Sequence, residues 1–355
     1  MRKLVSMLAA AVLVAAFAGP AAGASNDPHF AKQWGLQKIQ AEPAWAHSDG
    51  TGAVIAVVDS GVDLDHPDLA AKIIDNPDAD FVEPDGICTR DAKTGERVCV
   101  QDGPQDANGH GTHVAGIAAA ITGNGVGVAG TAPGARILPV RVLDAEGNGP
   151  TESVADGIRY AADHNADVIN LSLGYPAGVG DAIKLIGDLD PVYDAIAYAI
   201  GRGSVIVISA GNDTAPLCAQ PAAAPEVLCV GATDPRDLRS YYSNGDATLQ
   251  LKYLVAPGGA GLSCGEEIFS TYLRDADPLC STESGYEGIS GTSMAAPFVS
   301  GVAALLAGKG MTAHEITDCI LRTTDDLGTP GRDPIYGYGR LNALNAVTIC
   351  AAAGA

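Results

Sequence analysis

The chain has 355 residues, of which 47% are hydrophobic, and its 42 acidic against 21 basic side chains give a formal net charge of −21. This length suits one large α/β domain or two smaller ones, and no repeat, charge block or Pro-rich linker divides it, so we expect one domain. The acidity argues against nucleic acid and anionic membranes as partners, because both repel a negative surface.

The first 24 residues have the layout of a secretory signal peptide. Arg2 and Lys3 precede an apolar run over 4–17, and small residues at 22–24 offer a cleavage site. An uncleaved anchor is the alternative, but it needs about 20 apolar residues. We therefore expect a secreted protein with one folded domain over 25–355 and no membrane association after cleavage.

Short apolar runs alternate with helical patterns along the rest of the chain. Runs rich in Val and Ile are typical of strands buried on both faces of a parallel sheet. Their alternation with helices predicts an α/β fold with a doubly wound, mostly parallel sheet and helices on both faces. The predicted strands are 53–61, 135–144, 167–174, 204–212 and 227–233, and the predicted helices are 111–121, 152–165, 191–203, 293–309 and 313–324.

Polar residues follow several of these strands, where ligands of such sheets collect. Asp59, Ser172 and Asn212 each lie at the end of an apolar run. A single polar residue there is usually a turn former or a cap. Several at one edge of the sheet indicate a site.

Two histidines stand three residues apart in the stretch 108–120, among glycines and alanines. His110 and His113 lack the glutamate of a zinc-protease motif. The stretch alone leaves three alternatives open: half of a metal site, a catalytic base, or a helix start that carries imidazoles.

Ser293 opens a predicted helix within a stretch of small residues. A serine there is ordinarily an N-cap, but small neighbours also leave the space that a nucleophile needs, and a helix N-terminus favours an anion. A serine nucleophile needs an imidazole base, which needs a carboxylate. The chain offers Asp59, His110 and Ser293 in that order, with the amide of Asn212 as a donor to an oxyanion.

These segments together resemble the subtilisin-type serine proteases, the subtilase family, and most of all its branch of thermitase and bacterial subtilisins. The similarity runs over about 27–346. It implies a serine endopeptidase in which Asp59 orients His110, His110 is the general base and acid, and Ser293 is the acyl nucleophile. Asn212 and the Ser293 N–H would form the oxyanion hole, and His113 would be a buried structural histidine.

The resemblance also implies how a polypeptide binds. The substrate would add as an extended strand along 170–174, with 147–150 on its other side. The implied substrate-binding residues are Ser172, Leu173 and Gly174 on one wall of the specificity pocket, Ala210 and Gly211 on the opposite wall, and Gly149 beyond the peptide.

A structural calcium ion is implied in the same way, and no organic cofactor. Oxygen ligands that include two carboxylates suit Ca²⁺ better than zinc. The alternative is that these acids only cap turns. The implied ligands are Asp27, Asp68, the side chain of Asn124 and the carbonyls of Ile121, Val126 and Val128.

Export makes disulfides the expected state of the eight cysteines. No Cys-x-x-Cys pair occurs, which disfavours zinc knuckles and thioredoxin chemistry. Eight cysteines allow many pairings. One of them is the sequential set Cys88–Cys99, Cys218–Cys229, Cys264–Cys280 and Cys319–Cys350.

Two features depart from the family pattern. Only a few residues separate the cleavage site from the mature-like start, which leaves no room for a pro-domain. We expect either unaided folding, helped by calcium and disulfides, or a separate inhibitor or folding partner. The segment 83–105 is atypical of the family and predicts an acidic, disulfide-tied surface loop beside the cleft. We expect the enzyme to be a monomer.

Three other functions stay open. A carboxyl serine protease of the sedolisin type also has a serine helix, but His110 and Asn212 argue against it. A catalytically silent, protein-binding pseudoprotease usually lacks a member of the triad, and none is missing here. A structural or adhesive surface protein would have repeats or a wall anchor, which the sequence does not display.

Overall fold

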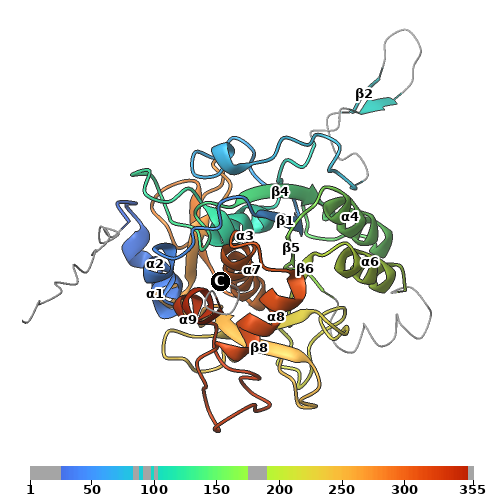
Figure 1. Cartoon of the computed structure of the whole chain (residues 1–355). Helices are drawn as coiled ribbons and strands as arrows, with labels where there is room; N and C mark the ends of the chain where they lie inside the picture. The colour runs from blue at the N-terminus through green and yellow to red at the C-terminus, as the bar shows by residue number, and fades with distance from the viewer. Residues whose placement is uncertain (1–24, 83–87, 91–96, 100–102, 175–189, 351–355) are drawn as a thin grey trace, which may run out of the picture.

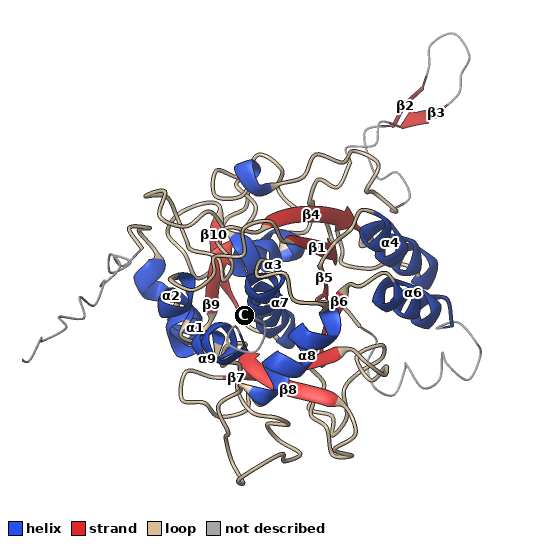
Figure 2. Ribbon diagram, viewed as in Figure 1, coloured by secondary structure: helices blue, strands red, loops and turns tan. Residues whose placement is uncertain are grey.

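The computed structural model describes residues 25–82, 88–90, 97–99, 103–174 and 190–350. The predicted signal peptide lies outside these ranges. A six-stranded sheet in the order β4-β1-β5-β6-β7-β8, with every neighbouring pair parallel, forms its centre (Figures 1 and 2). The predicted α/β fold is therefore confirmed. The strands are β1 (Val54–Asp59), β4 (Arg136–Arg141), β5 (Val168–Leu171), β6 (Val205–Ser209), β7 (Leu228–Thr233) and β8 (Lys252–Pro257).

Helices cover both faces of the sheet because its strands are apolar on both sides. Ile55 and Val57 of β1 belong to one hydrophobic core, while Ala56 and Val58 belong to the other. The first core includes α3 (His110–Ala119) and α7 (Thr292–Ala307), and the second includes α4 (Thr151–Asp163) and α6 (Asp190–Gly201).

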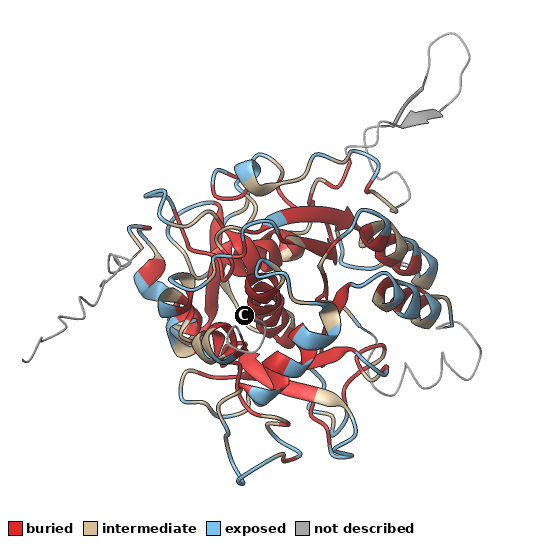
Figure 3. Ribbon diagram, viewed as in Figure 1, coloured by how far each residue is buried: buried red, intermediate tan, exposed pale blue. Residues whose placement is uncertain are grey.

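Helix α7 runs through the interior, and Figure 3 shows it buried while α4 and α6 carry exposed outer residues. A helix that is apolar all round belongs in a core. None of the helices in the described part of the chain is long and apolar enough to cross a membrane.

Several elements that the sequence pattern does not predict complete the fold. β8 adds an edge strand, and β9 (Ile268–Thr271) and β10 (Tyr286–Ile289) form an antiparallel ribbon. The predicted strand over 167–174 is too long, because pairing ends at Leu171. The helices at the surface are α1 (Trp34–Lys38), α2 (Ala41–Trp45), α8 (Ala313–Arg322) and α9 (Ala343–Ile349), with short 3-10 turns at Phe30–Lys32, Ala70–Lys72 and Cys264–Glu266.

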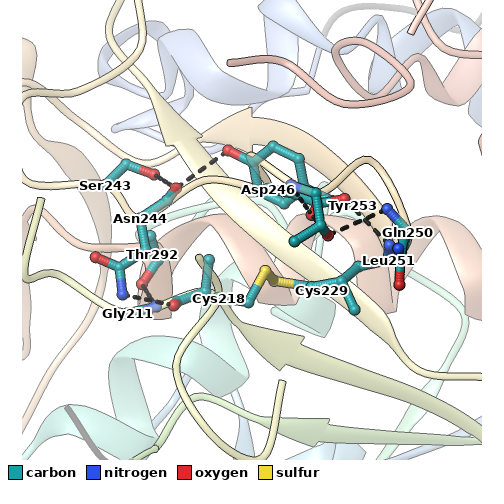
Figure 4. Close-up of a disulfide and its surroundings, with 12 residues drawn as sticks. Gly211, Cys218, Cys229, Ser243, Asn244, Asp246, Gln250, Leu251, Tyr253 and Thr292 are labelled. Carbon is teal, nitrogen blue, oxygen red and sulfur yellow. Dashed lines mark hydrogen bonds between the residues drawn. A yellow bond between two sulfur atoms is a disulfide. The ribbon is translucent and has the colours of Figure 1, made fainter. Parts of the chain in front are cut away.

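Three of the four sequential disulfides are confirmed. They join Cys218 to Cys229, Cys264 to Cys280, and Cys319 to Cys350. The first ties the loop after β6 to strand β7 (Figure 4). For the fourth, the backbones of β2 (Cys88–Arg90) and β3 (Arg97–Cys99) pair so that residue 88 lies opposite residue 99, while their side chains are outside the described part.

Candidate active site

The carboxylate that ends β1 holds the imidazole that begins α3. Asp59 is fully buried, and its Oδ1 accepts a 2.7 Å hydrogen bond from Nδ1 of His110. The N–H of Ser60 donates to the same oxygen at 2.8 Å. Since an ionised carboxylate only accepts, the shared proton lies on Nδ1, which leaves Nε2 as an acceptor. The His110 side chain is 29% exposed, so Nε2 can meet a substrate or a hydroxyl.

The surroundings of His110 favour its charged form. Burial alone would lower the pKa of the imidazole, but the charge of Asp59 and its hydrogen bond outweigh burial, and the charge of Asp106 adds to them. The pKa of His110 is therefore raised above its ordinary value.

Asp106 fixes the start of α3. Its Oδ1 accepts from the backbone N–H groups of Asn108 and Gly109 at 2.9 and 3.0 Å, and its Oδ2 accepts from that of Thr112 at 3.0 Å. Those of Gly109 and Thr112 are among the N–H groups that a helix start leaves unpaired. The sequence motifs do not indicate this residue, because it lies three positions before Gly109, the N-cap of α3, and not at the cap itself.

The glycines around His110 allow close packing of its helix. A Cβ on Gly111 would overlap the carbonyl oxygen of Gly61, and a Cβ on Gly116 would overlap the hydroxyl of Thr271. Because these two glycines have no side chains, α3 can lie directly against the loop after β1 and against β9.

Ser293, the second residue of α7, contacts the backbone that follows β5. Its Oγ donates to the carbonyl of Ser172 at 3.2 Å, and Ser172 Oγ donates to the carbonyl of Ser293 at 2.8 Å. Asn170 Nδ2 donates to Ser172 Oγ at 2.9 Å, and Ser300 Oγ donates to Asn170 Oδ1 at 2.8 Å. This chain of hydrogen bonds fixes the start of α7 against β5.

Asn212 is oriented by the residue before Ser293. Its Oδ1 accepts from both the N–H and the hydroxyl of Thr292, each at 3.0 Å. The same hydroxyl accepts from the N–H of Gly211 at 3.1 Å (Figure 4). Because its oxygen is occupied, Asn212 presents its NH₂ group as the free end of the amide.

Two adjoining cavities lie beyond the carboxyl ends of β1 and β5. The larger, about 500 Å³, is lined by His110, and the smaller, about 270 Å³, is lined by Ser293 and Asn212. They share Leu173 and Gly174. Strand order reverses at β1, since β4 lies on one side of it and β5 on the other. Parallel α/β sheets bind ligands at such a point.

Most of the predicted substrate residues line these cavities. Ala210 is the exception, because it is fully buried and lines neither. Gly149, Ser172, Leu173 and Gly174 line the larger cavity, and Leu173, Gly174 and Gly211 line the smaller. The larger also includes Asn148, from the predicted flanking segment 147–150, and Asn108, Leu143 and Glu146, which the sequence did not indicate.

His113 is the buried, hydrogen-bonded histidine that the sequence predicts. Its Nε2 lies 3.1 Å from the carbonyl oxygen of Glu287, and it therefore donates. Burial lowers the pKa of His113 to about 3, so the ring is neutral.

The two carboxylates of the predicted calcium set are buried and joined by Asn124. The N–H of Asn124 donates to Asp27 at 3.1 Å, and its Nδ2 donates to Asp68 at 2.8 Å. Within the described ranges, no basic side chain forms an ion pair with either. Burial raises the pKa of Asp68, and the charge of Asp27 raises it further. A bound cation would relieve this buried negative charge.

The rest of the set surrounds Asp68 closely. The N–H of Ile121 donates to the backbone carbonyl of Asp68 at 2.9 Å, and the N–H of Val128 donates to Oδ2 of Asp68 at 2.8 Å. A Cβ on Gly127 would overlap its carboxylate. The Asn124 amide must turn to offer its oxygen, which now accepts from the N–H of Val126 at 2.8 Å. The oxygen-only donors fit Ca²⁺, and the described part contains no group of three His, Cys, Asp or Glu side chains that could hold a metal ion.

An imidazole held by a buried aspartate, beside a cavity with a serine at a helix start, is the arrangement of a serine hydrolase. Residues 50–339 match the subtilase family. The chain belongs to the subtilase family, and it is a serine endopeptidase.

Similar proteins agree with this assignment. The chain is 42% identical to thermitase of Thermoactinomyces vulgaris, over 91% of this chain and 98% of thermitase. It is 40% identical to a thermophilic serine proteinase of a Bacillus species, over 92% of this chain and 70% of that protein. Among solved structures, a protease from Pseudoalteromonas arctica superimposes with a TM-score of 0.73 at 32% identity, over 92% and 99% of the two chains.

Proposed function

We propose that this enzyme cleaves polypeptides through an acyl-enzyme on Ser293. Nε2 of His110 accepts the hydroxyl proton as the oxygen attacks the scissile carbonyl, and it then gives that proton to the leaving amine. Asp59 keeps the proton of the other nitrogen in place and stabilises the imidazolium. The hydroxyl now donates to Ser172, so it rotates about its χ1 bond to reach His110.

The oxyanion of the tetrahedral intermediate is bound by the Asn212 NH₂ group and the Ser293 N–H in this proposal. Thr292 fixes the amide so that no reorganisation is needed when negative charge forms. Water then attacks the acyl-enzyme, with His110 again as the base.

The substrate binds as an extended strand along Leu173 and Gly174. Within the described part, neither residue makes a backbone–backbone hydrogen bond, so their N–H and C=O groups can pair with a peptide. Gly149 would flank the other side of the peptide, since it lines the same cavity.

One observation carries this proposal: the Asp59–His110 hydrogen bond beside the cavity of Ser293 and Asn212. The test is labelling of the enzyme with a fluorophosphonate, followed by mass spectrometry of its peptides and a casein-hydrolysis assay. We expect label on Ser293, casein cleavage, and loss of both in His110→Ala. A folded, unlabelled and inactive wild type would instead favour a protein-binding pseudoprotease.

We expect kcat/KM to fall on acidification with an apparent pKa above 6.5, the ordinary value for histidine. Only the neutral imidazole can accept the serine proton, and the raised pKa of His110 keeps the ring protonated to a higher pH than usual. A pH profile with a chromogenic peptide measures this. A midpoint below 6.5 would contradict the stated environment of His110.

We also propose that Asp27, Asp68, Asn124 and three carbonyls hold a structural Ca²⁺, which supplies positive charge between the two carboxylates. EDTA should lower the melting temperature by about 5 °C or more, because a ligand that binds only the folded state stabilises it. Asp68→Asn should melt lower in calcium and respond little to EDTA. The matched control is Asp65→Asn, whose side chain is 86% exposed. An EDTA-insensitive wild type would remove the calcium proposal.

Removal of residues 1–24 during export would release a monomeric enzyme with one domain over 25–355 in this proposal. The disulfides of the described part support an oxidising destination. Mass spectrometry of the protein from culture medium would test the cleavage site and the destination together.

A further inference from the structure

A third cavity, about 460 Å³, lies beside the nucleophile and shares no lining residue with the two cavities of the proposed cleft. One wall is Ile289 and Ser290, which lead into α7 three residues before Ser293. Another wall is Tyr272. Its hydroxyl donates to the carbonyl of Asn108 at 3.3 Å, and Asn108 is two residues before His110. The cavity therefore adjoins both the serine and the histidine.

This cavity is on the opposite side of the site from the larger cavity of the proposed cleft. It is built on β9 and β10, whereas Val154 of α4 lines the larger pocket. Figure 2 shows the β9–β10 ribbon and α4 on opposite sides of α3 and α7. A polypeptide that enters along Leu173 and Gly174 and crosses Ser293 continues toward this third cavity with its leaving-group residues.

The outer wall of the cavity is a fixed loop. The disulfide between Cys264 and Cys280 ties it to the segment before β9. The Glu287 carboxylate accepts from the N–H groups of Cys280 at 2.7 Å and of Gly288 at 2.6 Å. Leu279, also in this loop, is 93% exposed at the cavity. Glu287 is thus fully used in holding the loop.

Glu267 differs from Glu287, because its carboxylate has no partner among the described residues. The residue is 9% exposed and lines the cavity, yet its side chain makes no hydrogen bond or ion pair within the described ranges, and its Oε2 is buried. A Cβ on Gly288 would lie 3.1 Å from Cβ of Glu267 and 3.2 Å from that of Cys280, so both residues pack beside Gly288. Burial, together with the charge of Glu266, raises its pKa. A buried carboxylate without a partner is costly, and it calls for a ligand.

We infer that this cavity binds a lysine or arginine side chain located on the leaving-group side of the scissile bond, with Glu267 pairing its charge. The apolar walls at Tyr272, Leu279 and Ile289 suit the aliphatic stem of such a side chain, while its charged end reaches the carboxylate. The inference rests on the proposed acyl-enzyme function, because it needs a polypeptide that crosses Ser293.

The test compares two kinds of substrate. Internally quenched peptides carry lysine, norleucine or glutamate at each of the first three positions after the scissile bond, and a peptide p-nitroanilide has no residues there. We expect wild type to favour lysine over norleucine about tenfold in kcat/KM at one of these positions. Glu267→Gln should bring this ratio to about one and leave p-nitroanilide hydrolysis unchanged. The matched control, Glu266→Gln, removes a neighbouring charge that does not line the cavity and should keep the preference.

The outcomes separate the two proposals. A wild type that hydrolyses the p-nitroanilide but shows no lysine preference at any position overturns this inference and leaves the acyl-enzyme proposal standing. A preference that persists in Glu267→Gln, with normal p-nitroanilide hydrolysis as evidence of a folded variant, also overturns it. A wild type inactive on both substrates overturns the proposed function and this inference with it.

Discussion

Replacing Ser293 by alanine should abolish peptide-bond hydrolysis and leave the fold intact. The proposed acyl-enzyme needs this oxygen, and among the described residues the only other hydroxyl that lines the cavity of Asn212 is that of Ser209, the final residue of β6. We expect kcat/KM to fall by about four orders of magnitude or more. The lost side chain makes one hydrogen bond, at 3.2 Å, so stability should change by about 1 kcal/mol or less.

Two measurements check this result together. Hydrolysis of a chromogenic peptide gives the loss of activity, and thermal unfolding shows that the variant is folded. The control is Ser263→Ala, which removes an exposed hydroxyl that lines neither cavity of the proposed cleft, and it should keep wild-type activity. Residual activity of Ser293→Ala above about one per cent would assign the nucleophile to another residue.

The strands could be predicted from the sequence wherever an apolar run was long enough to stand out. The apolar runs of β1, β4, β5, β6 and β7 were long enough, because burial on both faces makes a strand apolar at every position. β8 is an edge strand of the same length as β1 and is buried in the same pattern, but its apolar run over 253–256 is short and lies between Lys252 and Pro257. The β9–β10 ribbon depends on pairing across a long loop, which local patterns do not report.

In the candidate site, too, some residues could be predicted from the sequence and others only from the structure. Asp59, His110 and Ser293 lie at the end of a strand or in the first turn of a helix, and Asn212 follows β6 by three residues. Each belongs to a recognisable motif, so the sequence alone could identify them. Thr292 could not be connected with Asn212, since the two are 80 residues apart in the chain. Likewise, Glu267 and Glu287 look equivalent in the sequence, and only the structure shows that one is satisfied and the other is not.

The second large effect is expected for Asp59→Asn, which should lower kcat/KM near neutral pH by about four orders of magnitude. Asp59 is fully buried, and its Oδ1 accepts a hydrogen bond from Nδ1 of His110 at 2.7 Å. An asparagine amide in the same place can turn its NH₂ group toward Nδ1 and donate instead. The neutral ring then carries its proton on Nε2, where it cannot accept one from Ser293.

Loss of the correct tautomer has a consequence that loss of charge alone does not. If Asp59 acted only through its charge, the variant would lose the raised pKa of His110, and its activity would recover once the ring was neutral. If Asp59 also fixes the tautomer, the loss of kcat/KM should persist at every pH at which the ring is neutral. A pH profile of kcat/KM for Asp59→Asn decides between these, with Asp65→Asn as an exposed control that should match wild type. Full recovery at neutral pH would show that the buried carboxylate contributes charge and does not set the position of the proton.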